Sequence, residues 1–238
     1  MMNQKHLAKV KILKVGTLCL EASELASTFT IQLKSDLGIG GGSTVTLIEA
    51  ERRILVDTGF DYEWVDTPSN GERNAENLVR ALRDHGIMPD DIDAIFITHW
   101  HKDHFGNLEV FRKAGRLASK NMVYRFGLEG FVGIDDQDKI ADSVRMMLTP
   151  GHTIDHASII VDSVVGGIKA RVAIAGDAVV SHSYFHSGRI WQYNADFHSV
   201  EAVRESMLRL IDVGDITGPG HGVPFMAFRP EWAESGSQ

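Results

Sequence analysis

One short segment constrains the fold of this chain more than any other. Residues 98–104 read Thr-His-Trp-His-Lys-Asp-His and follow an apolar run that is typical of a buried strand. At strand spacing His99 and His101 point the same way, and a following turn can bring Asp103 and His104 onto a second metal ion. Imidazole nitrogens and carboxylate oxygens bind Zn²⁺ and other first-row metals. The segment therefore predicts a metal centre where a strand ends, and its alternative is a solvated polar loop with a chance cluster of histidines.

Three further fragments each place a glycine beside a potential ligand at the end of an expected element. The ligands are His152 after the strand expected at 144–148, Asp177 after the strand expected at 170–176, and His221 after the helix expected at 196–213. Glycine lets the backbone turn sharply and approach a ligand closely. One such pair alone would favour an ordinary turn, but all the clusters in this order indicate one shared metal site.

Composition and charge narrow the classes of function. The 238 residues carry 24 Lys and Arg against 32 Asp and Glu, and a net charge of −8 argues against a protein that mainly binds nucleic acid through phosphates. The single Cys19 excludes an intrachain disulfide and a thiolate zinc cluster. No apolar run approaches the roughly 20 residues that cross a membrane, and the apolar stretch near the N-terminus is too short for a secretion signal. We therefore expect no membrane segment and a cytoplasmic protein.

Hydrophobic periodicity predicts one α/β domain that spans residues 1–238. Strands are expected at 9–15, 28–34, 43–49, 52–59, 91–99, 144–148, 156–162 and 170–176. Helices are expected at 73–85, 107–114 and 196–213. The last of these has Asp196 as its expected N-cap, and a short β-like step follows it. Residues 120–143 are expected to be irregular.

The ligand motifs in this order resemble those of the metallo-β-lactamase superfamily. They are His-X-His-X-Asp-His at 99–104, Gly-His at 151–152, Gly-Asp at 176–177 and Gly-His at 220–221, and Asp57-Thr58-Gly59 also matches the family's pattern. The resemblance covers roughly residues 29–224, which is most of the chain. It implies a four-layer αββα sandwich with a dinuclear metal site at one edge, between the two sheets.

The resemblance also implies a role for each ligand. The first metal ion would be bound by His99, His101 and His152, and the second by Asp103, His104 and His221, with Asp177 bridging the two. Asp57 stands where the family orients a ligand histidine, and the alternative is an aspartate that caps a turn. Zn²⁺ is the metal that these ligands favour, and Fe or Mn fits the same set.

A dinuclear site supplies a nucleophile without a catalytic Ser or Cys. Each cation lowers the pKa of bound water, so a hydroxide held by both metals would exist near neutral pH and could attack a carbonyl carbon or a phosphorus atom. Asp103 is the expected catalytic proton shuttle beside that water. The expected function is therefore a metal-dependent hydrolase that acts on a small-molecule ester, thioester or lactone-like substrate.

Other branches of the superfamily are disfavoured by what this chain lacks. The flavodiiron branch has Glu where this chain has His101. Only 17 residues follow His221, which leaves no room for the helical extension of glyoxalase II-like enzymes. Quorum-quenching lactonases have a Tyr at the position of Val180, and Tyr184 is displaced from it. Two of the ligand segments look closest to small proteins known only as metallo-β-lactamase domain-containing.

Residues 182–198 follow Asp177 and are rich in aromatic and histidine side chains. They could form a substrate wall, with packing against the last helix as the alternative. The candidate substrate-binding residues are Tyr184, His186, Trp191 and Tyr193. Arg189 could pair with an anionic substrate, although an exposed loop arginine is the plainer interpretation.

The competing function is a phosphodiesterase or nuclease that acts on RNA or DNA with the same metal site. It would need a basic groove, and the chain offers a modest cluster: Lys102, Arg112, Lys113, Arg116 and Lys120. A solvated helix face is the favoured interpretation of this cluster, so nucleic acid is not the favoured partner. A third alternative is a non-catalytic metal-bound sensor. No residue pattern predicts the oligomeric state.

Overall fold

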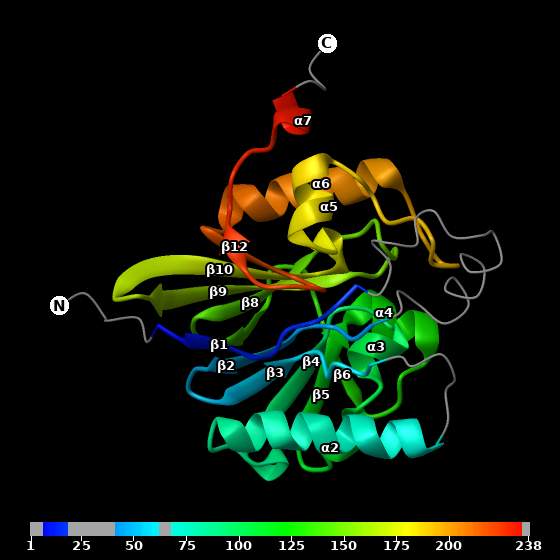
Figure 1. The fold of residues 1–238 in the computed structure, drawn as a ribbon, viewed down its shortest axis with the longest axis vertical. Helices are drawn as coiled ribbons and strands as arrows, with labels where there is room; N and C mark the ends of the chain where they lie inside the picture. Colours follow the sequence, from blue (N-terminus) through cyan, green and yellow to red (C-terminus); the bar gives the residue numbers. More distant parts are fainter. Residues whose placement is uncertain (1–6, 19–40, 62–67, 235–238) are drawn as a thin grey trace.

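Two six-stranded sheets pack against each other in the computed structural model, which describes residues 7–18, 41–61 and 68–234 (Figure 1). The first sheet has the strand order β1-β2-β3-β4-β5-β6. Its strands are β1 (Lys9–Lys14), β2 (Val45–Glu49), β3 (Arg53–Val56), β4 (Ala94–Ile97), β5 (Gly115–Ser119) and β6 (Phe131–Ile134). Strands β1 to β3 pair antiparallel, and the neighbours from β3 to β6 pair parallel.

The second sheet has the strand order β12-β11-β10-β9-β8-β7. Its strands are β7 (Lys139–Ala141), β8 (Val144–Leu148), β9 (Ala157–Val165), β10 (Ile168–Gly176), β11 (Ile216–Pro219) and β12 (Phe225–Met226). Strands β10 and β11 are parallel, and the other neighbours in this sheet are antiparallel. Parallel neighbours need a crossover connection, and the helices between β10 and β11 provide it.

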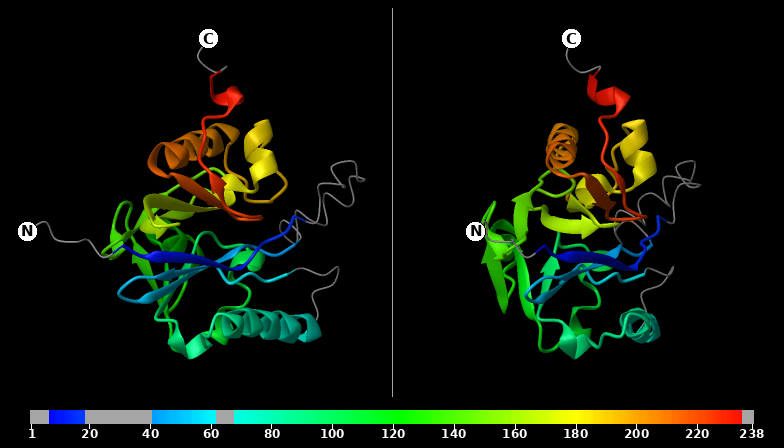
Figure 2. Two further views of the ribbon diagram at one scale, coloured as in Figure 1. Left: turned by 60° about the vertical axis from the view of Figure 1, so that its left-hand side comes forward. Right: turned by 90° about the vertical axis from the view of Figure 1, so that its left-hand side faces the viewer.

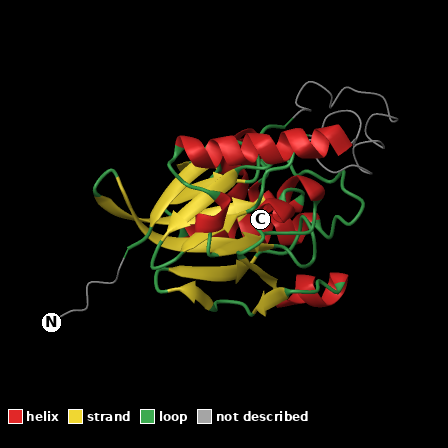
Figure 3. Ribbon diagram, turned by 90° about the horizontal axis from the view of Figure 1, so that it is seen from below, coloured by secondary structure: helices red, strands yellow, loops and turns green. Residues whose placement is uncertain are grey.

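Helices cover the outer faces of the two sheets (Figure 2). The long α2 (Pro68–Asp84) lies beneath the first sheet, and α5 (His182–Ser187) and α6 (Val200–Val213) lie above the second. Shorter helices are α3 (Lys102–Phe105), α4 (Lys120–Phe126) and α7 (Glu231–Glu234), with 3₁₀ turns at Pro89–Asp91, Leu108–Val110 and Asp177–Val179. Figure 3 views the layers along the stack, from below. The expected four-layer αββα sandwich is confirmed.

Apolar side chains fill the spaces between the layers. Phe96 of the first sheet and Ile159 of the second are fully buried in the cluster between the sheets. Leu78 and Leu82 are four residues apart on α2, so they share one helical face, and they pack on the outside of the first sheet. Met207 of α6 packs against the second sheet in the same way. Each such side chain contributes about 1.5–3 kcal/mol by leaving water, so both sheets are held between apolar layers.

The expectation that residues 120–143 are irregular is wrong. This stretch contains α4, β6 and β7, and β5 directly precedes it. Ser119 caps α4 by accepting a hydrogen bond from the backbone N–H of Met122, and Gly127 ends the helix in the left-handed conformation. The helix has seven residues, and β6 and β7 have four and three. Elements this short do not show a hydrophobic period in the sequence.

Two helix predictions also need correction. Residues 107–114 contain only the 3₁₀ turn Leu108–Val110 and no α-helix. Helix α6 begins at Val200, and Ser199 caps it by accepting a hydrogen bond from the backbone N–H of Ala202. Asp196 therefore lies before the helix and is not its cap. The strand expected at 28–34 and Cys19 lie outside the described residues.

Strand ends place the predicted metal ligands at one edge of the sandwich. Asp57 follows β3, the 99–104 segment follows β4, His152 follows β8, Asp177 follows β10 and His221 follows β11. Their potential ligand atoms lie close to one another, although the strands come from both sheets. Within the described residues, no helix is long and apolar enough to cross a membrane.

Candidate metal centre

Buried histidine and aspartate side chains form clusters whose ligand atoms lie within 4.8 Å of one another. One cluster is His99, His101 and His152, a second is Asp103, His104 and His221, and a third links His99 and His104 to Asp177. All of these side chains are at most 2% exposed except that of His101, which is 13% exposed. The structure thus brings together all seven residues that the sequence predicts as ligands.

The first ligand group consists of His99, His101 and His152. The Nδ1 atom of His101 lies 2.8 Å from Nε2 of His99 and 3.2 Å from Nε2 of His152. His101 has an extended backbone conformation just before α3, so the chain still has strand spacing between His99 and His101. Three ring nitrogens therefore converge on one point.

The second ligand group consists of Asp103, His104 and His221. Asp103 and His104 lie on α3, and both are completely buried. Oδ2 of Asp103 lies 3.3 Å from Nε2 of His221 and 3.6 Å from Nε2 of His104. Asp103 and His104, which follow a strand of the first sheet, thus face His221, which follows β11 of the second sheet.

Asp177 lies between the two groups, with one carboxylate oxygen toward each. Its Oδ1 is 3.4 Å from Nε2 of His104 and 3.4 Å from Nε2 of His221. Its Oδ2 is 3.4 Å from Nε2 of His152. Gly220 permits this position, because a Cβ there would collide with Oδ1 of Asp177. A carboxylate placed in this way can neutralise two cations at once.

Within the part of the chain that the structure describes, several of these buried polar atoms have no hydrogen-bond partner. They are both carboxylate oxygens of Asp103 and of Asp177, Nε2 of His104 and Nε2 of His221. Buried polar atoms are almost always paired in proteins, because leaving water without a partner is costly. Nitrogen and oxygen atoms gathered in this way fit Zn²⁺ or a similar divalent cation. The site residues therefore fit the metals that the sequence motifs imply.

Two histidines of the first group, His99 and His152, are uncharged near neutral pH in the metal-free protein. Burial lowers the pKa of His152 to about 3. Burial, together with the neighbouring His104 and His101, holds the pKa of His99 well below its usual value. Near neutral pH these two rings therefore present lone pairs that are ready to bind a cation.

The second group carries charge instead. Burial lowers the pKa of His221, but the carboxylates of Asp177 and Asp103 outweigh burial and raise it to about 9. The pKa of His104 is likewise well above its usual value, because Asp103 and Asp57 outweigh burial. Burial raises the pKa of Asp103, but His104 and His221 outweigh it and lower that pKa. Without a metal, this group holds protonated imidazoles against ionised carboxylates.

Asp57 contacts a ligand histidine from behind. Its Oδ2 accepts a hydrogen bond from Nδ1 of His104 at 2.8 Å, which leaves Nε2 of His104 directed at the site. Its Oδ1 accepts from the backbone N–H of Thr98 at 2.9 Å. Asp57 has a φ of 59°, in the left-handed region that few residues adopt, so its placement costs backbone strain. This geometry favours an orienting role over turn capping.

Sequence reasoning missed two other groups that hold ligand histidines. Nε2 of His101 lies 2.9 Å from Oδ1 of Asp196, the residue that was expected to cap a helix. Nδ1 of His221 lies 3.1 Å from the backbone oxygen of Thr17. These partners are 95 and 204 residues apart along the chain, so no local motif could have indicated them.

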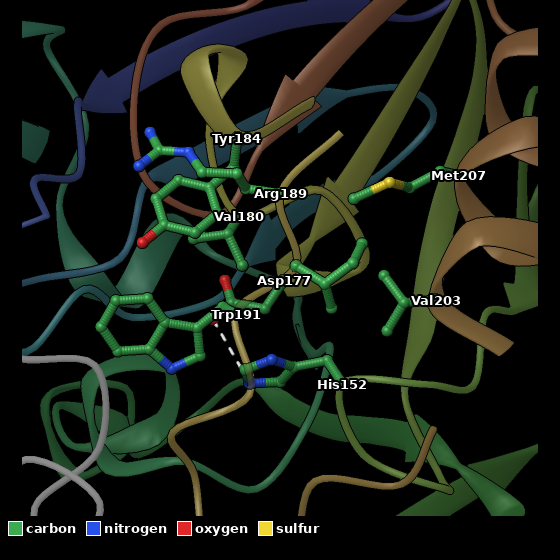
Figure 4. Close-up of a pocket in the computed structure, with 9 residues that line it drawn as sticks. His152, Asp177, Val180, Tyr184, Arg189, Trp191, Val203 and Met207 are labelled. Carbon is green, nitrogen blue, oxygen red and sulfur yellow. Dashed lines mark ion pairs between the residues drawn. The ribbon is translucent and has the colours of Figure 1, made fainter. Parts of the chain in front are cut away.

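The predicted substrate wall divides into buried and exposed residues. Figure 4 shows the cavity that the two buried ones line. Tyr184 and Trp191 are buried and line a cavity of about 10 Å³ together with His152 and Asp177. That is room for about one water molecule. The guanidinium of Arg189 lies 4.7 Å from the centre of the Tyr184 ring.

The two remaining candidate residues of this wall lie farther out. Tyr193 is 37% exposed and packs edge-on against Trp191, with ring centres 5.0 Å apart. His186 is exposed on α5 and packs against Phe228 rather than lining the cavity.

The basic cluster that a nucleic acid would need is largely neutralised. Lys113 pairs with Asp90 at 2.6 Å, Arg116 with Glu109 at 2.9 Å, and Lys120 with Asp135 at 3.0 Å. Lys102 lies 4.9 Å from the centre of the Phe60 ring. Three of the five residues in this cluster are thus paired with carboxylates, as expected of a solvated face.

Comparison with known sequences agrees with the geometry. The sequence model of the metallo-beta-lactamase superfamily matches residues 38–221. Metallo-beta-lactamase domain-containing protein 1 of Mus musculus is 32% identical over 193 residues, which are 79% of this chain and 67% of that protein. Thioesterase pkgB of Emericella nidulans is 27% identical over 192 residues, which are 78% of this chain and 49% of pkgB.

Solved structures share the fold. A Thermotoga maritima protein assigned to the metallo-beta-lactamases has a TM-score of 0.63 at 22% identity, and the match covers 93% of this chain and all of that one. An N-acyl homoserine lactone hydrolase, solved with its product at the catalytic metal centre, has a TM-score of 0.58 at 19% identity over 87% of this chain and 88% of its own. From its family match, its fold and its clustered candidate ligands, the chain belongs to the metallo-β-lactamase superfamily and is a hydrolase.

Proposed function

We propose that this protein hydrolyses a small-molecule acyl substrate, an ester, a thioester or a lactone-like compound, at a site for two divalent metal ions. The placement of Asp177 carries the proposal, because it directs one carboxylate oxygen at each of two buried ligand groups. The proposed ligands of the two ions are His99, His101 and His152 for one and Asp103, His104 and His221 for the other. Zn²⁺ is the proposed metal, with Fe or Mn as alternatives.

Bound divalent cations would supply a Lewis acid and a water molecule of lowered pKa. The protein's own residues do the rest. Asp57 holds the His104 ring so that Nε2 points into the site. Asp103 is buried and its pKa is lowered, so its carboxylate is ionised and able to accept a proton from the attacking water and pass it to the leaving group.

Three observations favour a carbonyl substrate over a phosphodiester. The fungal relative pkgB is named as a thioesterase, and the match reaches across most of this chain. The basic residues beyond the ligand motif are paired with Asp90, Glu109 and Asp135. Tyr184 and Trp191 bring aromatic surface beside Asp177 and His152, a lining that is common in pockets for small molecules. Among acyl substrates we place thioesters and open esters first, because Val180 stands where lactonases of this family have Tyr.

A substrate panel tests this proposal. Purified protein, reconstituted with Zn²⁺, is assayed against acyl thioesters, aryl esters, N-acyl homoserine lactones and bis(p-nitrophenyl) phosphate. We expect turnover of at least one acyl class that is lost with a chelator and restored by metal. Turnover of the phosphodiester alone would contradict the proposal and favour a nuclease or phosphodiesterase.

The control in this panel is the His152→Ala variant. It removes one proposed ligand of the first group and keeps the backbone oxygen of residue 152 that Asn194 contacts. Acyl turnover that survives equally in this variant and in the chelated protein would show that the activity does not come from this site.

A further inference from the structure

We infer that Asp196, braced by Arg125, is a positioning residue that sets the affinity of one metal ion, the one bound by His99, His101 and His152. This inference rests on the proposed two-metal site. It assigns a role to a residue that the sequence pattern placed at a helix cap and that the proposed ligand set does not include.

Asp196 contacts the outer nitrogen of a ligand histidine. Its Oδ1 lies 2.9 Å from Nε2 of His101, while Nδ1 of the same ring faces the nitrogens of His99 and His152. A carboxylate can only accept, so Nε2 of His101 carries a proton, and in the neutral tautomer with that proton Nδ1 has the lone pair that a cation needs. Asp196 thereby selects the tautomer that can bind a cation at the site.

Arg125 holds Asp196 in place from α4. Its guanidinium lies 3.6 Å from Oδ2 of Asp196 and 3.1 Å from Oδ2 of Asp155. Asp155 is 1% exposed and stands three residues after His152. One guanidinium therefore ties the partner of His101 to the loop that carries His152, and both histidines belong to the first group.

Asn194 forms a second connection between Asp196 and the loop that carries His152. Its Nδ2 donates to the backbone oxygen of His152 at 2.9 Å and to Oδ1 of Asp196 at 3.1 Å. The segment 194–196 thus contacts His101 by a side chain and His152 by the backbone. The second group has a separate support, because Asp57 holds His104.

The arrangement predicts a selective effect on metal affinity. Carboxylates behind a ligand histidine typically change metal affinity by about 10- to 100-fold when they are removed. Among the described residues Asp196 contacts a ligand of the first group and none of the second. Its loss should therefore weaken the binding of one ion and leave that of the other unchanged. Asn at this position keeps an acceptor but loses the charge, so Asp196→Asn should have a smaller effect than Asp196→Ala.

The experiment measures metal affinity without measuring catalysis. Wild type, Asp196→Ala, Asp196→Asn and Arg125→Met are stripped of metal and titrated with Zn²⁺ against a chromophoric chelator, with Co²⁺ absorption as a second readout. His101→Ala identifies which of the two binding steps belongs to the first group. Asp212→Asn is the matched control, because Asp212 is an exposed aspartate whose ion pair with Arg229 includes none of the proposed ligands.

His101→Ala should abolish one Zn²⁺-binding step. We expect Asp196→Ala to lower the Zn²⁺ affinity of that same step by about 10- to 100-fold and to leave the affinity of the other step within about threefold of wild type. Asp196→Asn and Arg125→Met should weaken the same step less. Equal weakening of both steps, or none in Asp196→Ala and Asp196→Asn, overturns the inference. A wild-type protein that binds no metal overturns the proposed function itself, so the two failures are distinguishable.

Discussion

Metal binding to the second ligand group should release protons between pH 7 and pH 9. Burial lowers the pKa of His221, but Asp177 and Asp103 outweigh burial and raise it to about 9. Nε2 of His221 must lose its proton before it can bind a metal. At pH 7, about two units below that pKa, removing the proton costs about 3 kcal/mol, which lowers metal affinity by about 100-fold relative to pH 9.

The first group should respond differently over the same range. Burial lowers the pKa of His152 to about 3, so its ring is already unprotonated at neutral pH. Raising the pH therefore removes no competing proton from this residue. The affinity of the second ion should rise by at least about tenfold per pH unit up to pH 9, because His221 alone releases one proton, while that of the first changes little.

Calorimetric titration of the metal-free protein with Zn²⁺ checks both statements. Each titration is run at pH 7 and at pH 9 in two buffers of different ionisation enthalpy, and the difference in heat counts the protons released. We expect at least one proton at pH 7 and fewer at pH 9. Affinities that do not depend on pH for either ion, with no proton released at pH 7, would refute the charge assignment.

Three further substitutions test separate parts of the structure. Asp103→Asn removes the proposed proton acceptor and should lower kcat on an acyl substrate by about 100-fold or more, measured at full metal occupancy. Gly220→Ala places a methyl group against Oδ1 of Asp177 and should lower the metal content found by elemental analysis. Leu210→Ala leaves a cavity at a fully buried position of α6 and should lower the free energy of unfolding by about 2–5 kcal/mol in urea titrations, with metal stoichiometry unchanged.

Each of these substitutions has a result that would count against the account. Near wild-type kcat in Asp103→Asn would remove that residue from proton transfer. Unchanged metal content in Gly220→Ala would mean that the Asp177 carboxylate is not held where the structure places it. An unfolding free energy within about 0.5 kcal/mol of wild type in Leu210→Ala would contradict the packing described for α6.

The clustering of the proposed ligands was predictable because each of these residues has a local signal. His152, Asp177 and His221 each stand beside a glycine at the end of a strand or turn, within one or two residues. The geometry of strand ends in a two-sheet fold then brings these separate segments to one edge. The resemblance to a known superfamily added the pairing of the ligands into two groups, which spacing alone could not supply.

The supports behind the ligands were not predictable, because they depend on contacts across the fold. Asp196 looked like a helix cap, but Ser199 caps α6 and Asp196 contacts His101 instead. The backbone oxygen of Thr17 behind His221 carries no residue-type signal at all.

Short elements at the sheet edges were missed for a related reason. Strand β6 pairs with β5, and β7 pairs with β8. Strands of three and four residues are stabilised by such neighbours rather than by a pattern of their own. A stretch such as 120–143 therefore looks irregular until the strands beside it are known.

Metal content tests the central claim most directly. The purified protein is stripped of metal, reconstituted with Zn²⁺, freed of excess metal by gel filtration at pH 8 and analysed by plasma mass spectrometry, with His152→Ala and His221→Ala treated in parallel. Two ligand groups that share Asp177 predict about two ions per chain in wild type and about one in each variant. Fewer than about one ion per reconstituted wild-type chain would contradict the account.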